Sequence, residues 1–360
     1  MKAYIVEKMD LQENIRILLE KAQDTPIYGV IKGNGYGLGL LELASALKEG
    51  GVDRFAVTDV RDVVTLRENG FQDEILMLEG TCLKEELEVL LTQGAVATVG
   101  SLECAKAMAQ VAEEMGKKFP CHLKIDTGMG RFGFLPEDAD AIDQVMSMEH
   151  LDIRGIYTHF HTAFASEEAT KAQFAAFQTV CDRLSEQGHS LTRHCCNSSA
   201  FLKYPEMHLD AVRLGSAILG RLSFPGDLGL KKIGWCEAPV ELVRTLPKGH
   251  TVGYGAAWKA KRETTIAICG VGYFHGFGAE KGNDLFRFRD CVRGGLGYVK
   301  AFLQKKAIYG KVNGKSARVL GHIGMVGTVM DVTGLDVQPG DIVRLEINPL
   351  LQKGLEILYR

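Results

Sequence analysis

A chain of 360 residues, 46% of them hydrophobic, is long enough for one large α/β domain and a smaller second domain. Its formal net charge of -3 and its dispersed lysines and arginines argue against a surface for nucleic acid or an anionic membrane. The sequence has no apolar run of about 18 residues, and acidic residues come too early for a signal peptide, so we expect a cytoplasmic protein.

The nine cysteines are odd in number and scattered, and no two form a Cys-x-x-Cys pair. This spacing predicts neither a disulfide framework nor a zinc ribbon, and no metal site is expected. We interpret the cysteines as reduced and mostly as small core residues. For the adjacent Cys195 and Cys196, packing beside a site is favoured over redox activity.

Short apolar runs alternate with amphipathic, helix-like stretches from about residue 28 to 220. Several of these stretches stop at glycine, which is typical of a helix C-terminus. The eight expected strands lie near 29–32, 54–58, 74–79, 96–100, 121–126, 153–160, 190–197 and 210–214. Eight strand-helix repeats predict a closed parallel (β/α)8 barrel of the TIM type, rather than an open sheet.

The pattern changes after residue 228 to strand-like runs separated by turn signals such as Asn313-Gly314 and Pro339-Gly340-Asp341. We therefore predict an α/β chain with a barrel domain over 1–228 and a mostly β domain over 229–360.

Polar side chains follow the ends of several predicted barrel strands, where such barrels carry their chemistry. Hydroxyls and a glycine lie at the usual phosphate site after the last two strands, and a lysine lies across the mouth. A phosphate and a lysine amine together suggest pyridoxal 5'-phosphate, whose aldehyde reacts with amines. Taken alone, a lysine at a strand end is more often one that reaches out to solvent. The residues at this rim are Lys32, Asn34, Tyr36, Lys124, Asp126, Arg131, His159, His161, His194, Asn197, Ser198, Ser199, Arg213, Gly215 and Ser216.

Six sequence strings resemble motifs of the alanine racemase family, in the family's order and over nearly the whole chain. They are "VIKGNGYGLG", "HLKIDTGMGRFGF", "GIYTHFHTA", "HCCNSSA", "VRLGSAILG" and "GVGYFHGF". The resemblance implies a pyridoxal-phosphate-dependent amino-acid racemase with a barrel followed by a β domain. It also implies a head-to-tail homodimer with shared active sites, which would supply D-alanine.

The resemblance implies two catalytic bases, because a proton removed and returned on one face regenerates the same enantiomer. Lys32 would hold the coenzyme covalently and act on one face of the substrate. Tyr273, from the β domain of the partner subunit, would act on the other. Without the motif, Tyr273 would be interpreted as a packed strand tyrosine.

Further roles are implied residue by residue. Arg213 would face the pyridine nitrogen of the coenzyme, and His159 would hydrogen-bond that arginine. Arg131 and Met325 would contact the substrate, and Lys124 matches a position that is carbamylated in some members. The phosphate would be bound by Tyr36, Ser198, Gly215 and Ser216.

The sequence also departs from the family pattern. His275 and Val326 occupy positions that are acidic in the family, and Leu38 replaces a frequent histidine. Tyr359 lacks the family's C-terminal context and is left out of the site. The stretch 279–306 is longer than the family loop and is either a helix that caps the active site or a surface excursion.

We expect a racemase that interconverts L- and D-alanine. One alternative is a racemase for another amino acid, such as serine or a basic amino acid. Another is a pyridoxal-phosphate-binding protein with little turnover.

Overall fold

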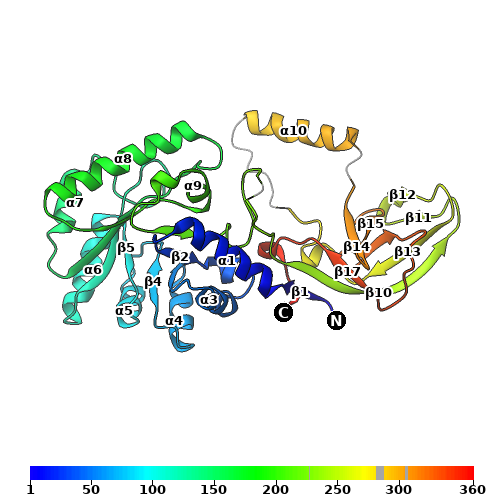
Figure 1. Cartoon of the computed structure of the whole chain (residues 1–360), viewed down its shortest axis with the longest axis horizontal. Coiled ribbons are helices and arrows are strands. Elements are labelled where there is room, and N and C mark those ends of the chain that lie inside the picture. Colours follow the sequence, from blue (N-terminus) through cyan, green and yellow to red (C-terminus); the bar gives the residue numbers. More distant parts are fainter. Residues whose placement is uncertain (227, 281–287, 305–306) are drawn as a thin grey trace. The chain divides into compact units, whose positions relative to one another are not determined.

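The computed structural model describes residues 1–226, 228–280, 288–304 and 307–360 (Figure 1). The chain forms two compact units, Lys8–Ile233 and a second made of Met1–Glu7 with Gly234–Arg360. The expected barrel domain began at residue 1, whereas the structure assigns the first seven residues to the second unit. Across the described ranges, none of the helices is both long enough and apolar enough to cross a membrane.

The first unit contains the eight predicted parallel strands. Four of them form a sheet in the order β4-β3-β2-β9, and the other four form a sheet in the order β5-β6-β7-β8. Their bounds are β2 Ile27–Val30, β3 Arg54–Val57, β4 Glu74–Met77, β5 Ala97–Val99, β6 Phe119–Lys124, β7 Leu151–Tyr157, β8 Thr192–His194 and β9 Val212–Leu214.

A few backbone hydrogen bonds at each of two seams join the two sheets into a closed barrel. At one seam the Met77 N–H donates to the Val96 carbonyl at 2.8 Å. At the other seam the Arg213 N–H donates to the Cys196 carbonyl at 3.0 Å. The predicted TIM-type barrel is confirmed, and its strands are buried almost throughout, as expected for a parallel sheet covered on both faces.

Helices follow the strands along the chain, and most have sequence signals at their ends. The side chains of Asp59, Ser101 and Ser166 accept hydrogen bonds from the first turns of α4, α6 and α8. The right-handed helices of this unit are α1 Lys8–Ala22, α3 Leu40–Glu49, α4 Val60–Glu68, α5 Lys84–Thr92, α6 Leu102–Glu114, α7 Ala139–Met146, α8 Glu167–Glu186 and α9 Ser198–Lys203, with a 3₁₀ turn, η1, at Pro205–Met207.

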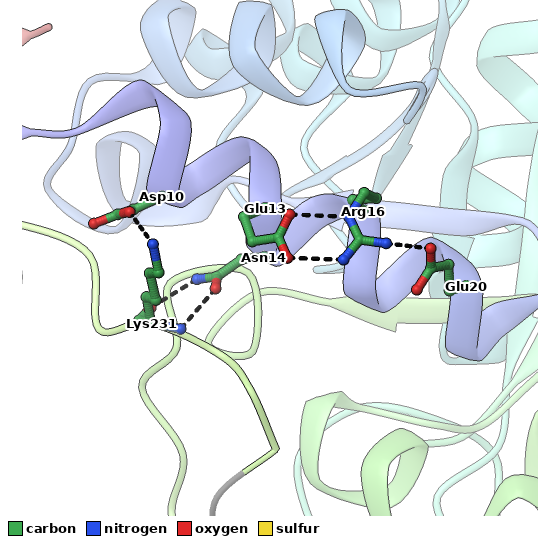
Figure 2. A network of polar contacts seen from close by, with 6 residues as sticks. All are labelled: Asp10, Glu13, Asn14, Arg16, Glu20 and Lys231. Carbon is green, nitrogen blue, oxygen red and sulfur yellow. Dashed lines mark hydrogen bonds and ion pairs between the residues drawn. The ribbon is translucent and has the colours of Figure 1, made fainter.

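Helix α1 is tied to the segment that leaves the barrel unit (Figure 2). The buried Asn14 side chain accepts from the Lys231 N–H at 2.7 Å and donates to the Lys231 carbonyl at 2.7 Å. A second Asn14 donation reaches the Ile218 carbonyl at 2.9 Å. On the same helix, the Asp10 carboxylate pairs with the Lys231 amine at 2.5 Å. These bonds anchor Lys231, two residues before the end of this unit at Ile233.

The second unit is built on one mostly antiparallel sheet that closes on itself. Its order is β13-β16-β15-β14-β17-β10-β1-β18, and the C-terminal half of β10 also pairs with β13. The bounds are β1 Ala3–Val6, β10 Trp235–Leu246, β13 Thr264–Cys269, β14 Tyr309–Val312, β15 Lys315–Val319, β16 Thr328–Asp331, β17 Ile342–Leu345 and β18 Glu356–Tyr359. Smaller elements are β11 Thr251–Val252, β12 Trp258–Lys259, η2 Tyr254–Ala256, η3 Tyr273–His275 and η4 Pro349–Leu351.

Strand β1 explains why the first residues belong to this second unit. It pairs antiparallel with β10 and parallel with β18, so that Ala3 lies between Glu237 and Glu356. The Tyr4 side chain is fully buried, and its hydroxyl donates to the Ile347 carbonyl at 3.0 Å. These partners are far away in sequence, and the local pattern around β1 carries no trace of them.

Part of the stretch 279–306 is helical, which agrees with the expected helix; that this helix caps the active site stays a prediction. Helix α10 spans Phe288–Leu303, and residues 281–287 and 305–306 lie outside the described part of the chain. The helix contains three glycines, at 294, 295 and 297, which are poor helix formers. Exposed apolar side chains recur along it at helical spacing: Phe288, Val292, Leu296, Val299 and Leu303.

Candidate active site

A cavity of about 280 Å³ opens at the C-terminal ends of the barrel strands. It brings together every barrel residue to which the sequence analysis gave a role, namely Lys32, Tyr36, Lys124, Arg131, His159, Ser198, Arg213, Gly215 and Ser216. Of the described residues that line it, four carry a lysine or arginine charge and one, Glu79, carries a carboxylate. The wall is therefore suited to an anionic ligand.

Lys32 follows β2 at the start of a left-handed turn. Gly33, Asn34, Gly35 and Tyr36 all have φ between 54° and 63°. Glycine and asparagine are the residues that adopt this conformation at low cost, which explains the spacing of the motif. The turn is then held by the Asn34 side chain, which accepts from the Leu40 N–H at 3.0 Å.

The Lys32 amine is half-buried, and burial lowers its pKa. The nearby Arg131 charge lowers the pKa further, while Glu79 opposes both effects. A lowered pKa increases the fraction of neutral amine, which is the form that attacks a carbonyl group or accepts a proton.

Hydroxyls and backbone N–H groups gather between Ser198 and Ser216. The Ser198 hydroxyl accepts from the backbone N–H groups of Gly215 and Ala217, at 3.1 and 3.2 Å. A Cβ added to Gly215 would lie 2.7 Å from Cζ of Tyr36, so only glycine lets the tyrosine ring approach. Burial raises the pKa of Tyr36 to about 12, which keeps its phenol a hydrogen-bond donor.

Arg213 is buried at the end of β9 and makes four hydrogen bonds with described residues, all from its two terminal nitrogens. Nη1 donates to Nδ1 of His194 at 2.5 Å and to the His194 carbonyl at 3.0 Å. Nη2 donates to the carbonyls of Thr158 and Cys195, at 2.6 and 3.3 Å. These bonds leave Nε for a ligand in the cavity. The histidine bonded to Arg213 is His194, and not His159 as the sequence analysis expected.

His159 lies in the cavity wall as a neutral ring. Burial lowers its pKa to about 3, helped by the charges of Arg213, Lys124, Lys32 and Arg131. A neutral imidazole among these cations adds no further positive charge.

Lys124 and Arg131 come from β6 and from the loop that follows it. Burial lowers the pKa of Lys124 to about 8, with further lowering by Arg131 and Arg213. The loop is held by Asp126, whose carboxylate accepts from the N–H groups of Met129 at 2.7 Å and Arg131 at 3.1 Å. Burial raises the pKa of Asp126, but the backbone N–H groups that bond to its carboxylate bring it below the usual value.

Tyr273 and Met325 lie next to each other in the second unit. The Tyr273 N–H donates to the Gly324 carbonyl at 3.0 Å, and the Phe274 N–H donates to the Met325 carbonyl at 2.9 Å. The side chains of Tyr273 and Met325 are 56% and 55% exposed. Both side chains are therefore available to another molecule.

The two residues at positions that are acidic in the family, His275 and Val326, differ in burial. His275 is buried, and its Nδ1 accepts from the Gly272 N–H at 3.2 Å, capping the short helix that carries Tyr273. Val326 is 55% exposed.

Sequence reasoning gave no role to several residues at or beneath the cavity. Glu79 and Tyr157 line it, while His122 and His194 lie buried in the barrel interior. Alternation along β6 was a usable signal, because residues two apart share a face, so His122 points to the same side as Lys124.

The sequence predicted that the cysteines are reduced and that no metal site is present. All nine cysteines are free, and seven are buried, including Cys195 and Cys196, whose thiols both donate to the Met207 carbonyl at 3.1 Å. In the part of the chain that the structure describes, no group of three or more His, Cys, Asp or Glu side chains is placed to hold a metal ion.

Comparisons with known proteins agree on one family. Residues 6–223 match the alanine racemase N-terminal domain, and residues 235–349 match the alanine racemase C-terminal domain. The chain is 31% identical over 349 residues to an alanine racemase of Methanococcus maripaludis, covering 93% of this chain and 85% of that protein. It is 35% identical over 274 residues to one of Carboxydothermus hydrogenoformans, covering 74% of each.

Solved structures give the same result. A structure of alanine racemase from Clostridium difficile 630 superimposes with a TM-score of 0.82 at 27% identity, covering 99% of this chain and 88% of that one. Alanine racemase from E. faecalis superimposes with a TM-score of 0.80, also at 27% identity, covering 96% of this chain and 88% of that one.

Proposed function

Because the chain belongs to the alanine racemase family, it is an isomerase that interconverts L- and D-alanine, and we propose that Lys32 and Tyr273 are its two bases. The observation that carries the proposal is the cavity. It brings together the Lys32 amine, whose pKa is lowered, a group of hydroxyls that can bind a phosphate, and Arg213, whose Nε is left for a ligand. Racemases for serine or basic amino acids, and a protein with little turnover, are not favoured by these relatives.

Pyridoxal phosphate fits the residues of the cavity. The wall is predominantly cationic, and Gly215 leaves room for the Tyr36 ring beside the hydroxyls of Ser198 and Ser216. When bound, this cofactor supplies an aldehyde for amines and a ring that withdraws electrons from the substrate Cα. Tyr36, Ser198, Gly215 and Ser216 would hold its phosphate, and the Lys32 amine would hold its aldehyde carbon.

Arg213 would donate from Nε to the pyridine nitrogen. Because a guanidinium remains protonated, it offers a hydrogen bond without giving up its proton, so the ring nitrogen stays largely unprotonated. Such a ring withdraws electrons weakly, which favours return of the proton to Cα over side reactions.

Arg131 and Met325 would bind the substrate. The Arg131 guanidinium suits the substrate carboxylate, since the two groups can form a charge-assisted pair. The Asp126 carboxylate holds the backbone of its loop in place, which fixes where this side chain starts.

The second base is proposed to come from the partner subunit of a head-to-tail homodimer in the cytoplasm. Support comes from the exposure of Tyr273 and from the backbone bonds that hold it beside Met325. In such a dimer the Lys32 amine would take the proton from one face of the substrate, and the Tyr273 phenol would deliver one to the other face.

Mixing variants tests this arrangement. Lys32→Ala subunits and Tyr273→Phe subunits are each expected to be inactive as racemases. If the site is shared, a mixed dimer carries one intact site, so an equal mixture should recover about a quarter of the wild-type activity. The double variant Lys32→Ala/Tyr273→Phe, mixed with itself, is the control. A mixture no more active than this control would rule out a shared site.

Covalent trapping tests the cofactor site. Borohydride reduction of the protein loaded with pyridoxal phosphate should leave the reduced cofactor covalently attached to Lys32. Attachment to another lysine would contradict the assignment.

Exchange of the α-proton in deuterated water, measured for alanine, serine, lysine and arginine, ranks the substrates. The proposal expects alanine to exchange fastest.

A further inference from the structure

Two histidines of the barrel interior are bonded to each other and then to Arg213. His122 on β6 and His194 on β8 are 2% and 0% exposed. Nδ1 of His122 lies 2.9 Å from Nε2 of His194, and Nη1 of Arg213 lies 2.5 Å from Nδ1 of His194. The three side chains thus form a hydrogen-bonded chain that starts at the cavity and ends inside the barrel.

The direction of these hydrogen bonds follows from the arginine. A guanidinium has donors and no acceptor, so Nδ1 of His194 must accept and carries no proton. The neutral His194 ring then holds its proton on Nε2 and donates it to Nδ1 of His122. His122 must therefore also be neutral, with its own proton on Nε2. One charged residue determines the tautomers of two histidines.

Charges and burial favour the same state. Burial lowers the pKa of His122 to about 3, with further lowering by Arg213, Arg154 and Arg54. The pKa of His194 is also well below its usual value, because the ring is buried and because Arg213 and His122 lie nearby.

Packing fixes the ring planes in which these bonds are made. The His194 ring stacks on the Tyr157 ring, with 4.9 Å between the ring centroids and 9° between the ring planes. It also stacks on the Tyr28 ring, with a centroid distance of 5.6 Å and an interplanar angle of 28°. The His122 ring lies against Gly155, where an added Cβ would come within 2.8 Å of its Nε2. With the rings held, Nδ1 of His194 is the one side-chain acceptor among the four acceptors that position the Arg213 guanidinium in the described part of the chain.

We propose that His122 is a positioning residue for racemisation: it accepts the Nε2 proton of His194, so that His194 presents an unprotonated Nδ1 to Arg213 and orients the guanidinium toward the cofactor. The inference rests on the proposed role of Arg213 as the partner of the pyridine ring. It adds a residue that touches neither cofactor nor substrate.

The test uses two substitutions of similar size and polarity. In His122→Asn the side-chain amide lies where Nδ1 was and can accept from His194. In His122→Gln the amide extends toward the former Nε2 position instead. If His122 only filled space, both variants would be affected alike. The proposal instead expects Asn to keep the hydrogen-bond acceptor for His194 that Gln lacks, and so to keep the function that Gln loses. Thr170→Val, which removes a buried hydroxyl on α8 outside the cavity, is the matched control.

The first readout is the histidine tautomer in protein without cofactor. Nitrogen NMR of ¹⁵N-histidine-labelled protein should show both His122 and His194 as neutral rings protonated on Nε2, with the signals assigned from the variants. A His194 ring protonated on Nδ1, or a charged ring at either position near pH 7, would overturn the proposal. This readout does not depend on racemase activity, so it separates a failure of the inference from a failure of the proposed function.

The second readout is binding and turnover. Removal of a supporting hydrogen bond of this kind typically costs about 10- to 100-fold, which is the loss we expect for His122→Gln in cofactor affinity and in kcat. The KM for alanine should change less, because Arg213 does not contact the substrate carboxylate. His122→Asn should stay within a few-fold of wild type. If Gln and Asn gave equal losses, or if Gln gave none, His122 would have no positioning role.

Discussion

Replacing Lys124 with methionine is expected to stabilise the protein near neutral pH, although two cation–π contacts are lost. Lys124 is 3% exposed, and its ammonium lies 5.4 Å from the ring centroid of Phe132 and 5.5 Å from that of Tyr157. The charges of Arg131 and Arg213 oppose it. Methionine fills a similar volume and has no charge to bury.

The magnitude follows from the lowered pKa of Lys124. The folded chain holds this pKa at about 8, against 10.5 for an unperturbed lysine, so the unfolded state binds the proton more tightly. At pH 7 the difference of about 2.5 pKa units costs about 3 kcal/mol of folding free energy. The cost is full below pH 8, shrinks as the pH rises toward 10.5 and vanishes above it.

Urea unfolding of cofactor-free protein at pH 7 and pH 10 measures this cost. Both tryptophans, Trp235 and Trp258, lie in the second unit, so their fluorescence follows that unit while circular dichroism follows the helices of the barrel. Lys124→Met should gain about 3 kcal/mol in the barrel at pH 7 and much less at pH 10. Exposed Lys106 on α6, changed to methionine, is the control.

Equal stability of wild type and Lys124→Met at pH 7 would refute the reasoning. Bicarbonate adds a second comparison, because carbamylation would replace the ammonium with an anion beside Arg131. Bicarbonate should then stabilise the wild type and leave Lys124→Met unchanged. The variant is also expected to be less active, since Arg131 loses a neighbour that could orient it.

Three further predictions concern the cavity and the second unit. Gly215→Ala should displace the Tyr36 ring and weaken binding of pyridoxal phosphate about tenfold or more by fluorescence titration, and unchanged affinity would contradict the close approach. Asp126→Asn should cost about 1–3 kcal/mol, because its amide oxygen can keep the bonds from Gly128 and Met129 while the NH2 that replaces Oδ2 cannot accept from the Arg131 N–H, and should raise the KM for alanine; a KM equal to wild type would count against the loop's role. Burial lowers the pKa of His275, yet once its Nδ1 is protonated the cap is lost, so kcat/KM should fall on the acid side, as the pH drops through this lowered pKa, in wild type and less in His275→Asp; identical acid limbs would exclude the cap as the cause.

Much of the barrel and its site could be predicted because the controlling interactions are local. The left-handed turn after Lys32 needs glycine or asparagine at consecutive positions, and this requirement is visible in the sequence. Every barrel strand except the last, β9, is followed by a helix in the described residues, so the rim residues could be assigned from the repeat alone. Of the fifteen rim residues so assigned, twelve line one cavity, whereas Asn34, Asp126 and His194 do not.

The parts of the fold and of the site that could not be predicted depend on contacts between segments that are distant in the sequence. No local pattern pairs Ala3 with Glu237 and Glu356, so β1 was assigned to the wrong unit. The partner of Arg213 was also misassigned, because the choice between His159 and His194 depends on which ring the barrel places at Nη1. Sequence reasoning had no means to rank two histidines at neighbouring strand ends.

The placement of β1 has a consequence for how the chain reaches its fold during translation. Strand β1 leaves the ribosome ahead of the whole barrel unit, whereas its partners β10 and β18 follow that unit. The barrel can form as its own contiguous segment emerges, but the second unit cannot close until its last strand has been made. Until then the backbone N–H and C=O groups of β1 have no partner strand. This short segment is therefore prone to aggregation and a target for chaperones.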